Sequence, residues 1–530
     1  MPKNKLYAYA ILTLILLATW HRYLFLGYLS EDFLVVSFHQ GSEIEGLFDI
    51  FFTKIVDGHY WRPVVYISYR LTELFSSDAI AHRIVSLALY IISSITLFEL
   101  LRKLKVKKVP ALLSASLFAV IYTHESQVAW IPGRTDVLMS IFIFTCLIYL
   151  IKYFDEKNIS SLVISTVLFI LASLSKEHAF IAIFLPLIIA MFFFKQEMRK
   201  ALYASGIFFL ALIGILLFRY FVIGGSPFES GNFASPTFIA FAKNYFVYPF
   251  LVFFRPEELE FAFNFLKNNL YALGLFIPVS FILLWAIVKR FKKMSNKHRR
   301  IFLFGATFFT VLIVPALPVI MRWYVFMPSL GIFTILASMM NRNNTFGLKA
   351  LIVIAILANI IIVNIRVGTW IDASAKSESI LSSFNKEITG QQSIRIWGLP
   401  DKYERINIFK IAPNVILADK NNISQDSILS PIRCEYYEDS KFDLSSSANK
   451  FIIFLEKGRF FIRGSKSMYV FKPEKYYIDN SEYTVSINNN YKSGEYISEM
   501  VIEFKSEPDL ERELFFNGKG IISSKNVILR

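Results

Sequence analysis

Apolar segments of membrane-spanning length recur through the first 365 residues of this 530-residue chain. A helix needs about 20 mostly apolar residues to cross a bilayer. The segments that we expect to span lie at 5–21, 82–101, 109–123, 136–152, 159–174, 178–194, 201–223, 270–288, 301–318, 324–340 and 347–365. With 55% hydrophobic and only 18% charged residues, the chain is too apolar for a soluble globule. The sequence therefore predicts an α-helical polytopic membrane protein with about 11 transmembrane helices.

Basic residues gather in the loops that follow every second predicted span, most densely at 102–108 and 289–300. Such loops face the cytoplasm in multi-pass proteins. This pattern predicts a cytoplasmic N-terminus in the cell (inner) membrane, and an odd number of spans then places the C-terminal residues outside. The net charge of +15 follows from these loops, so we expect membrane lipids and no nucleic acid as partners. If the apolar stretch 237–254 also spanned the membrane, the basic loop at 289–300 would lie outside the cytoplasm. We therefore interpret this stretch as a re-entrant or surface-lying helix.

The composition changes after Arg366, where the chain becomes polar. Short alternating runs appear at 393–397, 451–454, 460–463 and 483–487, a pattern typical of strands. We therefore expect a transmembrane domain over residues 1–370 and a small β-rich extracytoplasmic domain over residues 371–530. The two cysteines, Cys146 and Cys434, give neither a disulfide framework nor a thiolate metal site.

Two adjacent carboxylates, Glu31 and Asp32, follow the first predicted span. Acidic side chains near membrane hydrocarbon are costly, which makes them candidates for function. We interpret the pair as the centre of a catalytic site. The structural alternative is a hydrated interfacial loop that caps a helix.

The other loops predicted to face outward also carry charged and histidine side chains. These are Arg62, His124, Glu125, Arg134, Lys176 and Arg322. A carboxylate can take the proton of an acceptor hydroxyl while cations hold a phosphate leaving group. That chemistry fits sugar transfer from a polyprenyl-phosphate donor, whose phosphate lies at the membrane interface. Such a donor needs no nucleotide-binding motif, and the sequence contains none.

The stretch 122–136 reads Tyr-Thr-His-Glu-Ser-Gln-Val-Ala-Trp-Ile-Pro-Gly-Arg-Thr-Asp. It resembles a signature of the transmembrane-and-TPR O-mannosyltransferases, a family of the GT-C superfamily. Further matching elements follow the order of that family. They are Ser30-Glu-Asp-Phe33, Tyr60-Trp-Arg-Pro63, Ser173-Leu-Ser-Lys-Glu177, Arg322-Trp-Tyr-Val-Phe-Met-Pro-Ser-Leu-Gly331, and Arg366 with Trp370. The resemblance covers about residues 25–372 and implies a GT-C-like membrane glycosyltransferase, mannosyltransferase-like and dependent on a polyprenyl-phosphate sugar.

The sequence departs from this family at three places. Tyr122 replaces a His-Pro pair, Glu31 replaces the first acid of an Asp-Asp element, and a polar tail stands where the family has TPR repeats. The acceptor therefore stays open among protein, lipid and glycan hydroxyls, and the sugar stays open as well.

The resemblance assigns catalysis to Asp32 and Glu31, with Asp32 favoured as the base. It makes four cations candidates for binding the donor phosphate, namely Arg62, Arg134, Lys176 and Arg322. For His124 and Glu125 two interpretations stay open: a divalent-cation or substrate site, and a hydrogen-bonded loop anchor. We expect no certain cofactor beyond this candidate cation.

A polytopic transporter or a lipid-glycan flippase is the alternative function. It predicts charges in the middle of spans and sequence repeats that are related to each other. The charged residues instead lie at span ends and no repeat is visible, which favours the enzyme. A ligase that uses a diphosphate-linked donor would share the outward site but not this order of motifs.

Overall fold

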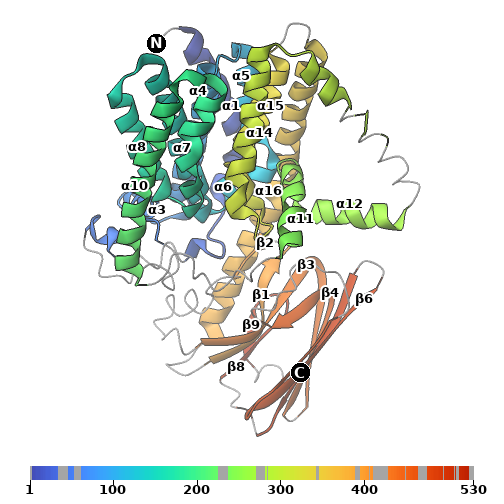
Figure 1. The fold of residues 1–530 in the computed structure, drawn as a ribbon. Helices are drawn as coiled ribbons and strands as arrows, with labels where there is room; N and C mark the ends of the chain where they lie inside the picture. Colours follow the sequence, from blue (N-terminus) through green and yellow to red (C-terminus); the bar gives the residue numbers. More distant parts are fainter. Residues whose placement is uncertain are drawn as a thin grey trace. The chain divides into compact units, whose positions relative to one another are not determined.

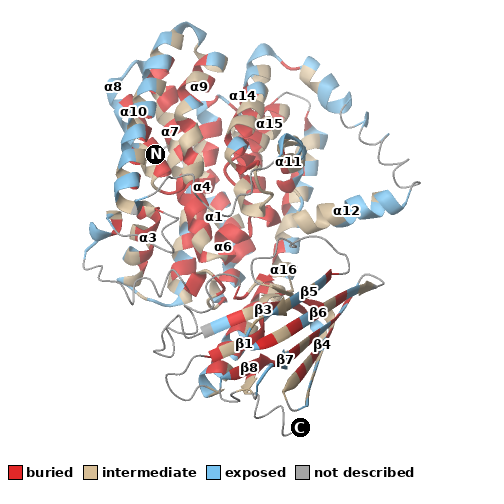
Figure 2. Cartoon of the chain, turned by 60° about the horizontal axis from the view of Figure 1, so that its bottom comes forward, coloured by how far each residue is buried: buried red, intermediate tan, exposed pale blue. Residues whose placement is uncertain are grey.

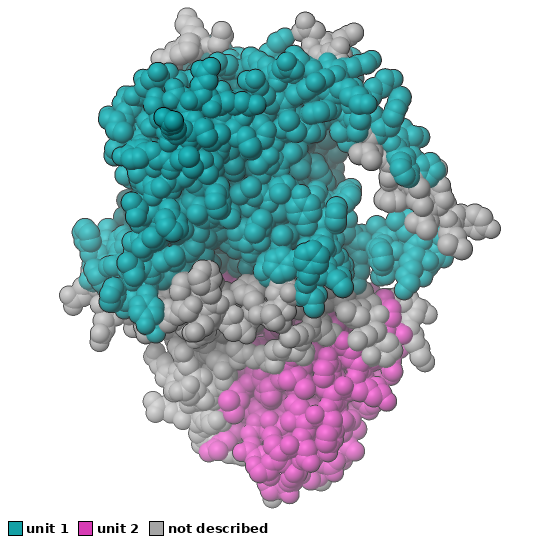
Figure 3. Space-filling view, viewed as in Figure 1, with its two compact units in different colours: residues 1–24, 43–365 teal, residues 25–42, 366–530 magenta. Residues whose placement is uncertain are grey.

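The computed structural model describes most of the chain. The described residues are 3–33, 46–52, 61–224, 237–269, 278, 281–282, 285–341, 345–387, 394–404, 406–409, 428–447, 449–462, 474–492, 495–506, 508 and 512–523. They form two compact units (Figure 3). Unit 1 consists of residues 1–24 and 43–365, and unit 2 consists of residues 25–42 and 366–530.

Unit 1 is helical. Its main helices are α1 (Lys3–Trp20), α3 (Pro63–Glu73), α4 (Ala79–Lys103), α5 (Lys108–Val120), α6 (Ser126–Ala129), α7 (Arg134–Glu156), α8 (Ile159–Ser173), α9 (Leu185–Phe193), α10 (Met198–Ile223), α11 (Phe238–Leu251), α12 (Pro256–Asn268), α14 (Asn296–Ile313), α15 (Ser329–Met340) and the first part of α16 (Phe346–Glu387). Short 3-10 helices connect several of them. Among them are η3 (Tyr122–His124), η4 (Ile131–Gly133), η5 (Glu177–Phe184) and η8 (Arg322–Val325).

Six helices among the described residues are long and apolar enough to cross a membrane. They cover Lys5–Phe25, Ala79–Lys103, Ile131–Glu156, Lys195–Val222, Asn296–Ala316 and Phe346–Glu387. Shorter apolar helices cover Lys108–Val120, Ile159–Ser173, Glu177–Phe193 and Ser329–Met340. The predicted span at 270–288 lies mostly outside the described residues. A mostly helical membrane half is therefore confirmed, whereas the number of about 11 spans stays a prediction.

Neighbouring helices pack along their apolar faces, as α4 does with α7, and α8 with α7 and α10 (Figure 1). Buried residues concentrate between the helices, while the outward sides of α8 and α10 are largely exposed (Figure 2). Many of the exposed side chains are nevertheless apolar, such as Leu210 at 68% and Phe221 at 81% exposure. In a soluble protein this surface would be unfavourable, but lipid tails are as apolar as these side chains.

Helices α14 and α15 approach each other closely through two glycines. A Cβ atom added to Gly305 would lie 2.6 Å from the carbonyl oxygen of Gly331, and one added to Gly331 would lie 2.3 Å from that of Gly305. Only glycine permits this contact, because any side chain would force the two backbones apart.

Several helix ends that carry charged residues meet in unit 1. Helix α7 begins at Arg134, α8 ends at Ser173, and α10 ends at Ile223, where Gly224 adopts a φ of +72°. A left-handed residue just after the last turn is the usual helix stop. Because these helices run in alternating directions, the start of α7 lies beside the ends of α8 and α10.

Unit 2 contains a nine-stranded mixed sheet among its described residues, in the order β5-β6-β7-β4-β3-β1-β8-β9, with β2 paired to β1. The strands are β1 (Ile394–Tyr403), β2 (Ile406–Asn407), β3 (Ile428–Ser447), β4 (Lys450–Ile462), β5 (Glu474–Asp479), β6 (Tyr483–Lys492), β7 (Glu495–Phe504), β8 (Glu513–Phe516) and β9 (Ile521–Ser523). In β7 buried and exposed residues alternate along almost the whole strand, as expected for a sheet with one covered face. The β-rich C-terminal region is thus confirmed.

The last turns of α16 belong to unit 2 and contact its sheet. The Ser383 hydroxyl accepts the Ile521 N–H at 2.8 Å, and the Glu387 carboxylate accepts the Ser523 N–H at 3.1 Å. Residues 25–42 also group with unit 2, which the sequence did not predict. There the Gly27 N–H donates to the Ser374 hydroxyl at 2.7 Å.

Candidate active site

The acidic pair lies in a tight turn of unit 2. Ser30 adopts a φ of +49°, an uncommon conformation for a residue with a side chain, and its N–H donates to the Ile408 carbonyl at 2.7 Å. Backbone conformations of this kind cost free energy and occur often at functional sites. The carboxylate of Asp32 is buried and accepts the Leu29 N–H at 3.1 Å, while Glu31 is half-buried. This hydrogen bond closes the turn, so Asp32 has a structural role whether or not it also acts in catalysis.

The other candidates lie in unit 1, where charged residues form two groups. The first, which we call the Glu177 cluster, consists of Arg62, Asp136, Lys176, Glu177 and Arg219. Arg62 precedes α3 and donates through Nε and Nη2 to one oxygen of Glu177, at 3.1 and 2.8 Å. Arg219, one turn before the end of α10, holds the other oxygen at 3.0 Å. Glu177 therefore clamps α3, η5 and α10 together through charge-assisted hydrogen bonds.

Lys176 and Asp136 form the buried part of the same cluster. The ammonium of Lys176 lies 2.6 Å from Oδ1 of Asp136, and both side chains are at most 4% exposed. Asp136 stands in the first turn of α7, where the helix dipole favours a negative charge. The pair satisfies two charges that burial would otherwise make very costly.

The second group, the Glu125 cluster, consists of Glu125, Arg255 and Arg322. Oε1 of the buried Glu125 contacts the guanidinium of Arg255, which precedes α12, and lies 3.2 Å from Nη1 of Arg322, which starts η8. The two arginine side chains are 11% and 16% exposed. Two cations on one carboxylate leave a net positive charge that reaches the surface.

His124 is next to Glu125 but is enclosed by aromatic rings. Phe118 and Phe326 lie 4.9 and 4.7 Å from its ring, between centroids, and Nδ1 lies 3.2 Å from the Tyr90 hydroxyl. Burial lowers the pKa of His124 to about 3, so the ring is neutral at physiological pH. Among the described residues no group of three or more His, Cys, Asp or Glu side chains could hold a metal ion. These contacts favour the loop-anchor interpretation of His124.

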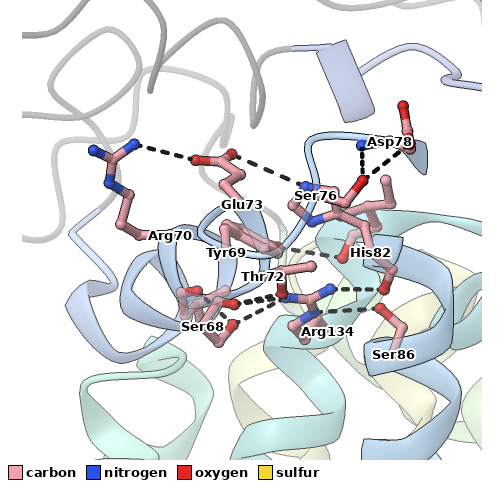
Figure 4. Close-up of polar contacts among 12 residues, drawn as sticks. Ser68, Tyr69, Arg70, Thr72, Glu73, Ser76, Asp78, His82, Ser86 and Arg134 are labelled. Atoms are coloured by element: carbon pink, nitrogen blue, oxygen red, sulfur yellow. Dashed lines mark hydrogen bonds and ion pairs between the residues drawn. The ribbon is translucent and has the colours of Figure 1, made fainter. Parts of the chain in front are cut away.

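Arg134 is fully buried at the start of α7 and binds two other helices (Figure 4). Its guanidinium donates to the Ser68 carbonyl and Thr72 hydroxyl of α3, at 3.0 and 3.2 Å. It also donates to the His82 carbonyl and Ser86 hydroxyl of α4, at 2.7 and 3.3 Å. Every nitrogen of the guanidinium is thus engaged within the protein, and we leave Arg134 out of the proposed phosphate-binding set.

Sequence reasoning missed Arg219 and Arg255 as members of the site. A signal was present for Arg219, because an arginine inside a predicted apolar span is itself a hypothesis of function. Arg255 follows an apolar stretch whose membrane placement the sequence left open, and nothing in the sequence pairs it with Glu125.

Comparison with known proteins supports the resemblance that these residues carry. Residues 63–223 match the family model described as dolichyl-phosphate-mannose-protein mannosyltransferase. This segment is therefore similar to the mannosyltransferases of that family. It carries Glu125 and all of the Glu177 cluster except Arg62, which directly precedes it.

One curated relative of the chain is the protein O-mannosyl-transferase Tmtc1 of Drosophila melanogaster. The two are 29% identical over 147 residues, which is 26% of this chain and 16% of the relative. The likeness thus spans less than a fifth of the relative.

Proposed function

We propose that this protein transfers a sugar from a polyprenyl-phosphate donor to an acceptor hydroxyl on the extracytoplasmic face of the membrane. The observation that carries this proposal is the excess of cations in the two clusters of unit 1. Five cations, Arg62, Lys176, Arg219, Arg255 and Arg322, accompany three carboxylates, Glu125, Asp136 and Glu177. The surplus of two positive charges complements the phosphate of a glycosyl phosphodiester.

The reachable cations are the ones suited to hold that phosphate. The side chains of Arg62 and Arg322 are 18% and 16% exposed, whereas those of Lys176 and Arg219 are only 4% and 5% exposed. Arg62 and Arg322 would bind the phosphate oxygens directly, and the buried cations would keep the local potential positive.

In the proposed step, the acceptor oxygen attacks the anomeric carbon of the sugar and the bond from that carbon to the phosphate oxygen breaks. The polyprenyl phosphate leaves with the electron pair, and the acceptor proton passes to a carboxylate, which we assign to Asp32 with Glu31 beside it. The name of the Drosophila relative describes transfer to protein, which favours a protein hydroxyl as the acceptor.

The test is sugar transfer by membranes that contain the full-length protein. Radiolabelled polyprenyl-phosphate mannose and the corresponding glucose donor are supplied with endogenous acceptors, and the Asp32→Asn protein serves as the control. Label that moves across the membrane while still attached to its lipid, without transfer to any acceptor, would favour the flippase over the enzyme.

Arg322→Lys should weaken donor binding, whereas Arg134→Lys should lower the stability of the fold. Lysine at 322 keeps a positive charge beside Glu125 but loses the planar fork, so we expect the Kd for the lipid donor to rise tenfold or more, since a hydrogen bond to a charged group contributes about 1.5–3 kcal/mol. Lysine at 134 cannot make the four buried bonds and should instead lower the thermal unfolding temperature. Donor titration and thermal unfolding of both purified variants check this, and an unchanged Kd for Arg322→Lys would remove Arg322 from the site.

We also propose that unit 2 and the catalytic residues face the extracytoplasmic side of the inner membrane. The basic loops at 102–108 and 289–300 support this topology. A reporter enzyme that works only outside the cytoplasm, fused after Arg530, should be active. A second fusion within 289–300 should be inactive, and activity of the second with inactivity of the first would reverse the topology.

A further inference from the structure

Two tryptophans from separate parts of the sequence meet beside the cation clusters of unit 1. Trp130 stands between α6 and η4, and Trp323 lies in η8. Their ring centroids are 5.4 Å apart, with an angle of 50° between the ring planes. Both indoles are half-buried, so part of each ring reaches the surface. We call this pair the tryptophan shelf.

The shelf lies between the two charged groups. Arg322, which binds Glu125, directly precedes Trp323 in the chain, and Tyr324 directly follows it. The ring of Tyr324 contacts the ammonium of Lys176 at 4.9 Å and the ring of His178 at 4.5 Å. The short helix η8 therefore presents a guanidinium of one cluster, an aromatic surface, and a ring that covers the buried lysine of the other.

This juxtaposition fits a ligand that has an anionic group and a carbon ring within a few ångströms of each other. A pyranose attached to phosphate is such a ligand, because its axial C–H bonds form an apolar face next to the charged oxygens. Aromatic rings carry negative charge on their faces and attract polarised C–H groups. Indole offers the largest such surface of any side chain, and its N–H can donate to a sugar hydroxyl.

We propose that the tryptophan shelf binds the sugar ring of the lipid-linked donor, while Arg322 binds its phosphate. This inference rests on the proposed function and adds the subsite for the sugar. It makes Trp130 and Trp323 determinants of sugar specificity, because the orientation of the hydroxyls decides how flat a face the sugar presents. The competing explanation is that the indoles anchor the protein at the membrane interface, where tryptophan is enriched.

The experiment compares two ligands that differ only in the sugar. Binding of polyprenyl-phosphate mannose and of polyprenyl phosphate without sugar is measured for the full-length protein in nanodiscs, in the wild type and in Trp323→Ala, Trp130→Ala and Trp323→Phe. The matched control is Trp285→Ala, because Trp285 is 60% exposed and lies outside both clusters.

We expect the Kd for the mannosyl lipid to rise about tenfold in either alanine variant, which corresponds to about 1.4 kcal/mol, and to rise less in Trp323→Phe. The Kd for the sugar-free lipid should stay unchanged, as should both values in the control. If the alanine variants lost the same affinity for both lipids, or lost affinity for neither, the tryptophan shelf would not be a sugar site. Wild-type protein that binds neither lipid would overturn the proposed function itself.

Discussion

Asp32→Asn should slow sugar transfer on the order of 10²–10⁴-fold at saturating donor, the usual contribution of a general base. Asparagine has nearly the same size, and its side-chain oxygen can still accept the N–H of Leu29, so the turn should keep its conformation. The loss should appear in turnover and not in the Kd for the donor, because the proposed phosphate ligands are cations of unit 1. Initial rates with membranes normalised for protein content provide the measurement.

Glu31→Gln is the matched comparison. Glu31 is half-buried, whereas Asp32 is buried, and we expect Glu31 to orient the acceptor or to affect its neighbour through like-charge proximity, at a smaller cost. A larger loss in Glu31→Gln would exchange the two roles. If both variants kept near wild-type turnover, the pair would have only a structural role in its turn, and the proposed base would be wrong.

Asp136→Ala should destabilise the membrane half by about 3–5 kcal/mol, because it leaves the ammonium of Lys176 buried without its carboxylate. The double variant Asp136→Ala with Lys176→Met should recover a large part of this loss, since it removes both charges. Thermal unfolding of purified protein in one detergent would measure all three forms.

The exposed pair Lys152–Glu156 provides the control for this cycle. Its atoms are 3.8 Å apart and its side chains are 38% and 51% exposed, so Glu156→Ala should cost less than about 1 kcal/mol. If the double variant were less stable than Asp136→Ala, Lys176 would stabilise the fold through the packing of its side chain. The loss in Asp136→Ala would then not come from an unpaired buried charge.

The sequence predicted the membrane half and the strand-rich C-terminal region well, because both depend on local patterns. Span lengths follow from apolar runs, and the alternation in 483–487 is visible as β6. The length of individual helices was less predictable. For example, the apolar run 347–365 is only the first half of α16, which continues to Glu387, since a helix can leave the membrane without any signal in its apolar part.

The roles of single charged residues could not be read from the sequence. Arg134 and Arg322 look alike there, since each is an arginine at the end of a predicted span within a motif. In the structure Arg134 is enclosed by the carbonyls and hydroxyls of α3 and α4, whereas Arg322 is partly exposed beside Glu125. The difference depends on helices distant in sequence, and only the packed structure reveals which cation remains accessible to a ligand.

The discontinuity of unit 2 has a consequence for the order in which the protein is made. Residues 25–42 leave the ribosome early, yet the backbone bond that holds their turn joins Ser30 to Ile408, and the sheet around Ile408 ends near Ser523. Closing such a long loop is slow and requires both ends to be present. The acidic pair therefore acquires its final surroundings only after the strands of unit 2 have been synthesised, and a nascent chain whose first helices are already inserted would still lack the Ile408 partner of Ser30.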